Sequence, residues 1–276
     1  MALSLVTNIA SFRAQRNLAK TTNQLSGNIE RLSSGLRINR AGDDAARSSI
    51  SSQIGAQILG IGQAMRNASD AVSLTQTAEG ALAQNNDIIS RMRELAVQAS
   101  NEGTLDSTER GYLDQEFQLL ESELNRIVAV TEFNGTKLID GSLSAGTSFQ
   151  VGFKNSSGDR ISITVTSSDA TNLGLNDELL TSATGAQAAI TALDTALSTV
   201  ATHRASLGAS ENRLTMTLSS LAAYHENMSA TNSRLRDADI AEETAAFTRN
   251  QILTSAGTSV LAQANAIPQS ALALLG

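Results

Sequence analysis

The chain has 276 residues, enough for one or two domains, with one Pro, no Trp and no Cys. Its 20 basic and 27 acidic residues give a net charge of −7, which argues against a protein whose main task is to bind nucleic acid. The lack of Cys excludes a disulfide framework and a thiolate-bound metal, and no apolar run approaches the ~20 residues that span a bilayer.

The N-terminal segment does not resemble a secretory signal. Residues 1–9 have no basic leader and no long apolar block, and the first basic residues follow them. We therefore expect either a cytosolic protein or one exported without a cleaved signal peptide. Further along, apolar residues recur at steps of four and three, which predicts a helix with one apolar stripe. The stripe contains Leu18, Leu25, Ile29 and Leu32.

Three further segments, residues 44–100, 106–129 and 178–235, have the same helical spacing. Asp106 followed by Glu109 predicts a capping box at the start of the second segment. None of these stripes can be buried by one helix alone, so we expect a mainly α protein built as a long antiparallel coiled-coil or helical bundle rod. The apolar positions include Ile61, Leu82, Ile89, Met92, Phe117, Leu124, Leu193, Val200, Leu207 and Leu214.

Between the second and third segments, the period changes from helical to alternating. Apolar residues alternate with polar ones at 149–153 and at 161–165, which predicts a β-hairpin with a loop of about four to six residues. Asn134-Gly135 and Gly141 are typical of turns. The small β-hairpin region therefore covers residues 131–176 within a rod domain at 41–236.

The two ends of the chain are complementary. Leu253, Val260, Ile267 and Leu274 recur every seven residues near the C-terminus. Residues 1–40 hold six basic residues and one acidic residue, whereas residues 237–276 hold four acidic residues and one basic residue. We expect residues 1–40 and 237–276 to form one domain of paired helices. Because this pair can bury little beyond one seam, we expect it to be poorly ordered in a monomer and ordered against copies of itself.

No catalytic, cofactor or metal site emerges from the sequence. His203 and His225 are the only histidines, and we interpret them as solvated or seam-edge residues. Asp43-Asp44 is typical of a helix cap, and the glycines near residue 60 match no phosphate-binding pattern. We therefore expect a protein that is not an enzyme and that binds neither nucleic acid nor membrane.

Four stretches, in this order along the chain, resemble one protein family. They are RLSSGLRINRAGDDAA at 31–46, RMRELAVQASN at 91–101, TEFNGTKLIDG at 131–141 and QILTSAGTSVLAQANAIPQ at 251–269. Together they are similar to bacterial flagellin, in a minimal form with almost no variable outer domain. The resemblance implies a subunit of the extracellular flagellar filament that polymerises with copies of itself, through seams that we assign to the terminal stripes.

The resemblance also implies partners. These are a flagellin chaperone, the flagellar export apparatus through which the chain passes unfolded, the filament cap at the growing tip, and hook-associated proteins. It further implies that the Toll-like flagellin receptor of animal hosts recognises Arg91, Leu95 and Gln98, with Glu116 on the next helix.

Two other interpretations remain open at this point. A hook–filament junction protein would have the same kind of terminal helices. A coiled-coil type III secreted scaffold or translocator would act on membranes, and liposome binding would favour it.

Overall fold

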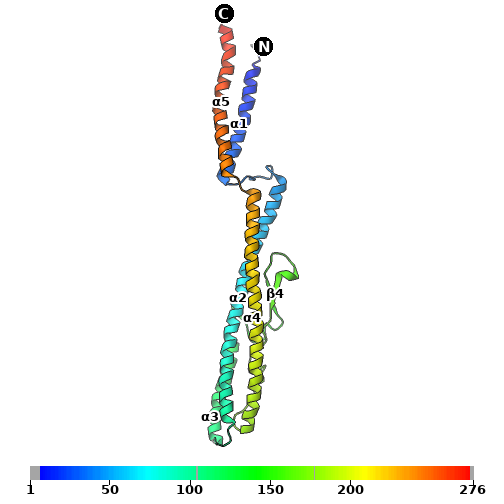
Figure 1. The fold of residues 1–276 in the computed structure, drawn as a ribbon, viewed down its shortest axis with the longest axis vertical. Helices are drawn as coiled ribbons and strands as arrows, with labels where there is room; N and C mark the ends of the chain where they lie inside the picture. The colour runs from blue at the N-terminus through cyan, green and yellow to red at the C-terminus, as the bar shows by residue number, and fades with distance from the viewer. Residues whose placement is uncertain (1–6, 104, 177, 274–276) are drawn as a thin grey trace. The chain divides into compact units, whose positions relative to one another are not determined.

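The computed structural model describes residues 7–103, 105–176 and 178–273, with side chains as far as residue 267. The helices are α1 (Ile9–Ser34), α2 (Ala45–Ala99), α3 (Ser107–Val130), α4 (Ala183–Arg236) and α5 (Ile240–Ala273). The strands are β1 (Glu132–Phe133), β2 (Thr136–Lys137), β3 (Thr147–Gln150) and β4 (Arg160–Ile163), with a 3-10 turn, η1 (Ser157–Asp159), before β4. Figure 1 shows these elements along the chain.

The chain forms two compact units. The terminal unit comprises Met1–Ala56 and Asn227–Gly276, and the central unit comprises Gln57–Glu226. The limits of both units fall within α2 and α4 rather than at the ends of helices. The division predicted from the sequence, residues 1–40 with 237–276 against residues 41–236, stays a prediction.

In the central unit, α2, α3 and α4 pack as an antiparallel bundle, as the sequence predicts. Arg93 on α2 pairs with Asp194 on α4, and Arg204 on α4 approaches Glu79, so the two helices run in opposite directions. Their facing stripes form one core with α3. The predicted positions Ile61, Leu82, Ile89, Met92, Phe117, Leu124, Leu193, Val200, Leu207 and Leu214 are all buried.

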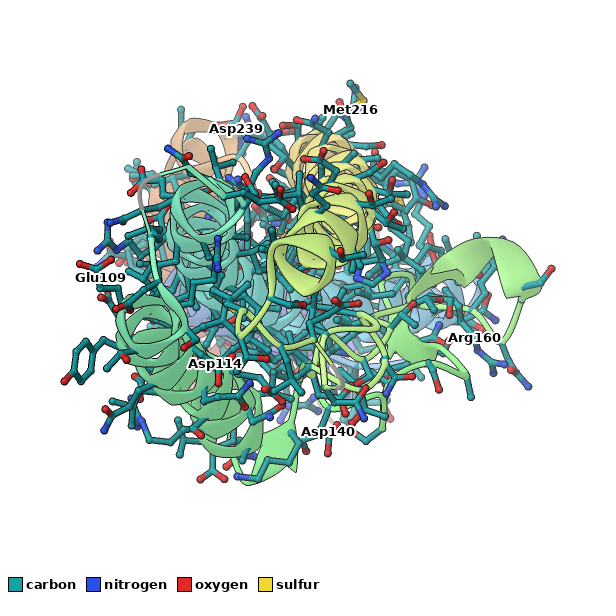
Figure 2. The ribbon with its side chains drawn as sticks, turned by 90° about the horizontal axis from the view of Figure 1, so that it is seen from below. Glu109, Asp114, Asp140, Arg160, Met216 and Asp239 are labelled. Carbon is teal, nitrogen blue, oxygen red and sulfur yellow. The ribbon has the colours of Figure 1, made fainter. Side chains whose placement is uncertain are left out.

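The hairpin of β3 and β4 is antiparallel, with Phe149 opposite Ile161. The predicted loop length is wrong, because the strands end at Gln150 and resume at Arg160. Phe153 leaves the alternation and turns to α4, where its ring stacks on Tyr224 with centroids 5.7 Å apart. Figure 2 shows Arg160 on the hairpin, projecting to one side of the helices.

A second hairpin and a later helix start also differ from the sequence prediction. Asn134 and Gly135 both have positive φ and connect β1 to β2, as in a two-residue hairpin turn. The long fourth helix begins at Ala183, not at residue 178. Its approach is held by Asp114 of α3, whose Oδ1 accepts the N–H of the buried Leu180 at 2.7 Å.

In the terminal unit, α1 ends at Gly35, which has a left-handed φ of 71° and donates its N–H to Arg31 O. The segments after α1 and before α5 then pair. Leu36 and Asp237 form an antiparallel bridge, in which Arg37 N donates to Arg236 O at 2.7 Å and Ala238 N donates to Gly35 O at 2.9 Å. The bridge therefore holds the C-terminal end of α1 beside the N-terminal end of α5.

Candidate assembly surface of the terminal helices

The two terminal helices run antiparallel and in close contact along their length. Near one end, Asn8 donates its Nδ2–H to Ala264 O at 2.7 Å, and near the other, Arg31 meets Glu243. Between them, a Cβ added to Gly257 would lie 3.2 Å from Leu18 Cδ1. Small residues on α5 therefore let the two helices approach each other.

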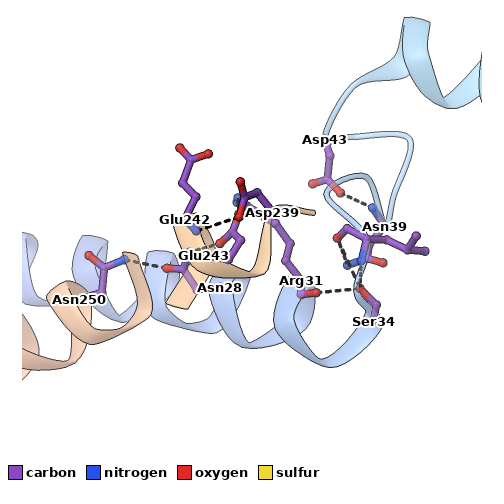
Figure 3. A network of polar contacts seen from close by, with 10 residues as sticks. Asn28, Arg31, Ser34, Asn39, Asp43, Asp239, Glu242, Glu243 and Asn250 are labelled. Atoms are coloured by element: carbon purple, nitrogen blue, oxygen red, sulfur yellow. Dashed lines mark hydrogen bonds and ion pairs between the residues drawn. The ribbon is translucent and has the colours of Figure 1, made fainter. Parts of the chain in front are cut away.

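A buried polar network lies within this interface (Figure 3). Asn28 is 6 % exposed and donates to Glu243 Oε2 at 2.5 Å, while Arg31 Nη1 donates to Glu243 Oε1 at 2.6 Å. Asn250 donates to Asn28 Oδ1 at 2.8 Å. Each of these groups would lose its partners if α1 slid by one turn against α5, so the network favours a single register.

Some of the apolar residues predicted as polymerisation seams lie between the two helices of the pair, and others are exposed to solvent. Leu18, Leu25 and Leu32 are half-buried on the side of α1 that faces α5, whereas Ile29 is 50 % exposed. Leu253, Val260 and Ile267 are 48 %, 53 % and 54 % exposed. The α5 side that faces α1 instead carries Gly257 and the buried Ala264. Leu274 lies outside the described residues.

Helix α5 has an unusual distribution of charge and apolar area. Arg249 is the last charged residue of the chain, and the 27 residues that follow have none. The first half of α5 also exposes Ile240 and Ile252. A helix that is apolar on several sides is normally covered by protein, yet α1 covers one side of α5 only. The terminal unit therefore exposes apolar faces that a further protein surface would cover.

The residues assigned to receptor recognition lie in the central unit and are not equally accessible. Arg91 Nη2 pairs with Glu116 Oε1 at 2.8 Å and its Nη1 with Glu94 Oε2 at 2.9 Å. Hydrogen bonds to Glu116 and Glu94 raise the pKa of Arg91 above its usual value. Gln98 is exposed, but Leu95 is 1 % exposed and packs in the core. Leu95 therefore lies beneath this surface rather than on it.

The histidines do not come together. Nδ1 of His203 lies 3.2 Å from Ser168 Oγ, and burial lowers the pKa of His203. No group of three or more His, Asp or Glu side chains within the described residues is placed to hold a metal ion. In the same residues, no helix combines the length and apolarity that crossing a membrane requires.

Sequence reasoning missed the residues that hold α1 to α5. Asn28 lies three residues after Leu25 and four before Leu32, on the same stripe, and Gly257 and Ala264 are spaced by seven on α5. A polar residue within an apolar stripe and a regular line of small residues are both signals of close helix pairing. The prediction from the sequence was instead based on the larger apolar residues of α5, of which Leu253, Val260 and Ile267 are exposed.

Comparison with known proteins identifies the family. Residues 5–144 match the family model described as bacterial flagellin N-terminal helical region, and residues 190–275 match the one described as bacterial flagellin C-terminal helical region. The chain is 46% identical over 270 residues to a flagellin of Halalkalibacterium halodurans, covering 97% of this chain and 98% of that protein. It is 39% identical to a flagellin of Bacillus subtilis, with the same coverage of both.

One solved structure agrees with this assignment, and a second shares the fold. A crystal structure of Bacillus cereus flagellin has 32% identity and a TM-score of 0.51, covering 60% of this chain and 94% of that one. A chain described as a putative flagellar hook-associated protein of Vibrio parahaemolyticus has 13% identity and a TM-score of 0.59, covering 71% and 100% respectively, and shares the fold alone. Because both family models and relatives spanning almost the whole chain agree, the chain belongs to the bacterial flagellin family.

Proposed function

We propose that this flagellin polymerises through the exposed apolar faces of its terminal unit to form the extracellular flagellar filament that drives swimming. The observation that carries the proposal is the exposure of Leu253 and Val260 on an α5 that is covered by α1 on one side only. A filament grows when each subunit offers surfaces that another copy covers without closing a ring. We extend the seam to Ile29, Ile267 and Leu274, and propose that Leu18, Leu25 and Leu32, which face α5 within one copy, contribute by holding the helix pair together.

Assembly would also order the terminal helices. A lone α1–α5 pair buries one narrow seam, and short helix pairs of this kind are marginal in water. Burial against neighbouring copies stabilises the helical form by mass action, so filament stability becomes a property of many subunits. For assembly outside the cell, we propose that a chaperone protects the chain before export, that the chain is exported unfolded, and that it folds beneath a filament cap beyond the hook-associated proteins.

The exposed cluster around Arg91, Gln98 and Glu116 is our proposal for the surface that the Toll-like flagellin receptor of hosts recognises. It consists of polar side chains on α2 and α3 that the core below them holds in place. A reporter-cell assay that compares the wild-type monomer with Arg91→Ala tests this. Loss of signal in the variant alone supports the assignment, and an absence of response to the wild type contradicts it.

Electron microscopy of the purified protein in negative stain tests the main proposal. Wild-type protein with filament seeds should form long tubes, and a variant that lacks residues 1–32 should remain a soluble, partly helical monomer. Tubes of normal appearance from the truncated variant would refute the role of the α1 seam. Wild-type protein that binds liposomes and forms no tubes would instead support a type III secreted translocator, and short caps on existing tubes would support a hook–filament junction protein.

We propose no enzymatic activity. The matching family models describe helical regions of bacterial flagellin.

A further inference from the structure

The terminal unit has a groove along the α1–α5 pair that is strongly basic. Its volume is about 970 Å³, and its charged lining consists of Arg16, Lys20, Arg31 and Arg249. Arg31 is paired with Glu243, but within the described residues no carboxylate forms an ion pair with Arg16, Lys20 or Arg249. The groove therefore holds three uncompensated positive charges.

A complementary acidic site lies at the start of α5. Asp237, Asp239 and Glu242 are exposed there, and none of them has an ion-pair partner within the described part of the chain. Asp239 caps α5 by accepting the N–H groups of Ala241 and Glu242, whereas the Glu242 side chain points away from the helix pair (Figure 3). Capping accounts for Asp239. Glu242 lies in the first turn of α5, where a negative charge favours the helix, and its exposed carboxylate can still bind a cation of another copy.

Within the described residues of one copy, Arg31 is the only charged residue of the groove that forms an ion pair with the start of α5, through Glu243. Arg16, Lys20 and Arg249 lie further along the two helices. Along α5, Glu242 and Arg249 are separated by seven residues, which is ~10 Å, and Arg16 lies ~18 Å along α1 from Asn28. Charges at the surface are largely screened beyond ~8 Å at physiological salt. A second copy displaced along the helix axis could bring its acidic site to the groove.

We propose that the basic groove of one subunit binds the acidic start of α5 of the next subunit. This contact joins two different surfaces, so it repeats without closing, which suits an open polymer. It rests on the proposed function, and deepens it by naming the charged residues that set the offset between copies. Burial of the exposed apolar faces stabilises the contact but does not select one offset between copies. The charge pairs favour a single offset and raise the rate of association.

Two charge reversals and their mixture test this contact directly. Arg249→Glu leaves the acidic site intact and Glu242→Arg leaves the groove intact. In a filament of either variant alone, position 242 of one copy and position 249 of the next would carry like charges. In an equimolar mixture, the arginine introduced by Glu242→Arg can meet the glutamate introduced by Arg249→Glu, and the unchanged Glu242 can meet the unchanged Arg249. Alternating subunits therefore restore both contacts.

Elongation from wild-type seeds is measured by light scattering and sedimentation at about 50 mM salt, where surface charges act strongly. We expect each variant alone to elongate at least about tenfold more slowly than the wild type, and the mixture to recover to within about threefold. The matched control mixes Arg249→Glu with Lys20→Glu. Both of these change the groove, so their mixture should show no recovery.

The outcomes separate the inference from the proposed function. If the wild-type protein does not elongate the seeds, both the proposed function and the inference are wrong. If the wild type elongates and either variant alone matches it, or if the mixture of Arg249→Glu with Glu242→Arg does not recover, the charged contact is wrong while filament formation stands.

Discussion

Gly257 of α5 lies directly against Leu18 of α1, where an added Cβ would come within 3.2 Å of the leucine Cδ1. This contact shows how the terminal helices pair. Towards its C-terminal half, the side of α5 that meets α1 carries the small residues Gly257 and Ala264, while Val260 and Ile267 remain exposed. A face with this division can hold α1 and still offer apolar area to another copy.

The first prediction concerns that contact. Gly257→Val adds an isopropyl group where the space is already filled, so we expect the filament to lose about 1–3 kcal/mol of stability per subunit. The matched control is Gly208→Val on α4, because a Cβ there meets nothing within 4 Å. Thermal depolymerisation followed by circular dichroism measures both. Equal melting of the two variants would contradict the close approach.

The second prediction concerns the buried network. Glu243→Ala removes the acceptor of both Asn28 and Arg31 and leaves the Asn28 amide without its carboxylate partner. We expect a loss of about 1–3 kcal/mol in the stability of the helix pair within filaments. Glu242→Ala is the control for stability, measured at high salt, because that side chain is exposed and points away from the helix pair. A similar loss in both variants would show that the network does not hold the register.

The third prediction concerns the hairpin of the central unit. Phe153 stacks on Tyr224, and its Cβ lies 3.0 Å from the position that a Cβ on Gly60 would occupy. Phe153→Ala should lower the free energy of unfolding of the central unit by about 2 kcal/mol. Tyr112→Ala, at a 69 % exposed aromatic residue on α3, should change it little. Urea unfolding of the monomer, followed by circular dichroism, distinguishes the two.

The fourth prediction is a pH dependence. Burial lowers the pKa of His203 below 6.5, so near that pH the unfolded chain binds more protons than the folded one. The stability of the central unit should therefore be fully present above pH 6.5 and should fall as the pH drops towards the folded pKa. Urea unfolding between about pH 7 and pH 5 measures this slope.

His203→Gln should flatten that slope, whereas His225→Gln, which keeps His203, should retain it. If the His203→Gln variant keeps the full wild-type slope, the loss of stability at low pH has another origin.

The apolar periodicity predicted the long helices because each of them buries one continuous stripe. Leu193, Leu207 and Leu214 recur with the period that a helix in a bundle requires, and all three are in the core. The capping box predicted at Asp106 and Glu109 is also confirmed. It could be predicted because it depends only on two residues that are three positions apart. Sequence patterns that depend on residues within a few turns of one helix therefore predicted the folded structure correctly.

Other features depend on contacts between distant segments and could not be predicted in the same way. Phe153 ends the strand alternation because its ring stacks on Tyr224 of α4. The helix α4 begins later than predicted because the N–H of Leu180 donates to Asp114 of α3. In the terminal unit, Asn28 and Gly257 acquire their roles only when α1 and α5 face each other. Local spacing marks the apolar residues but does not show which side of a helix its neighbour will cover.

The most direct measurement of the central claim is the seeded polymerisation of Val260→Asp, followed by sedimentation. The residue is 53 % exposed in one copy, so a charge there should block its burial against another copy. Thr258→Asp, an exposed polar position on α5, is the control. We predict that Val260→Asp stays in the supernatant while the control sediments. Sedimentation of Val260→Asp in the wild-type proportion would contradict assembly through this face.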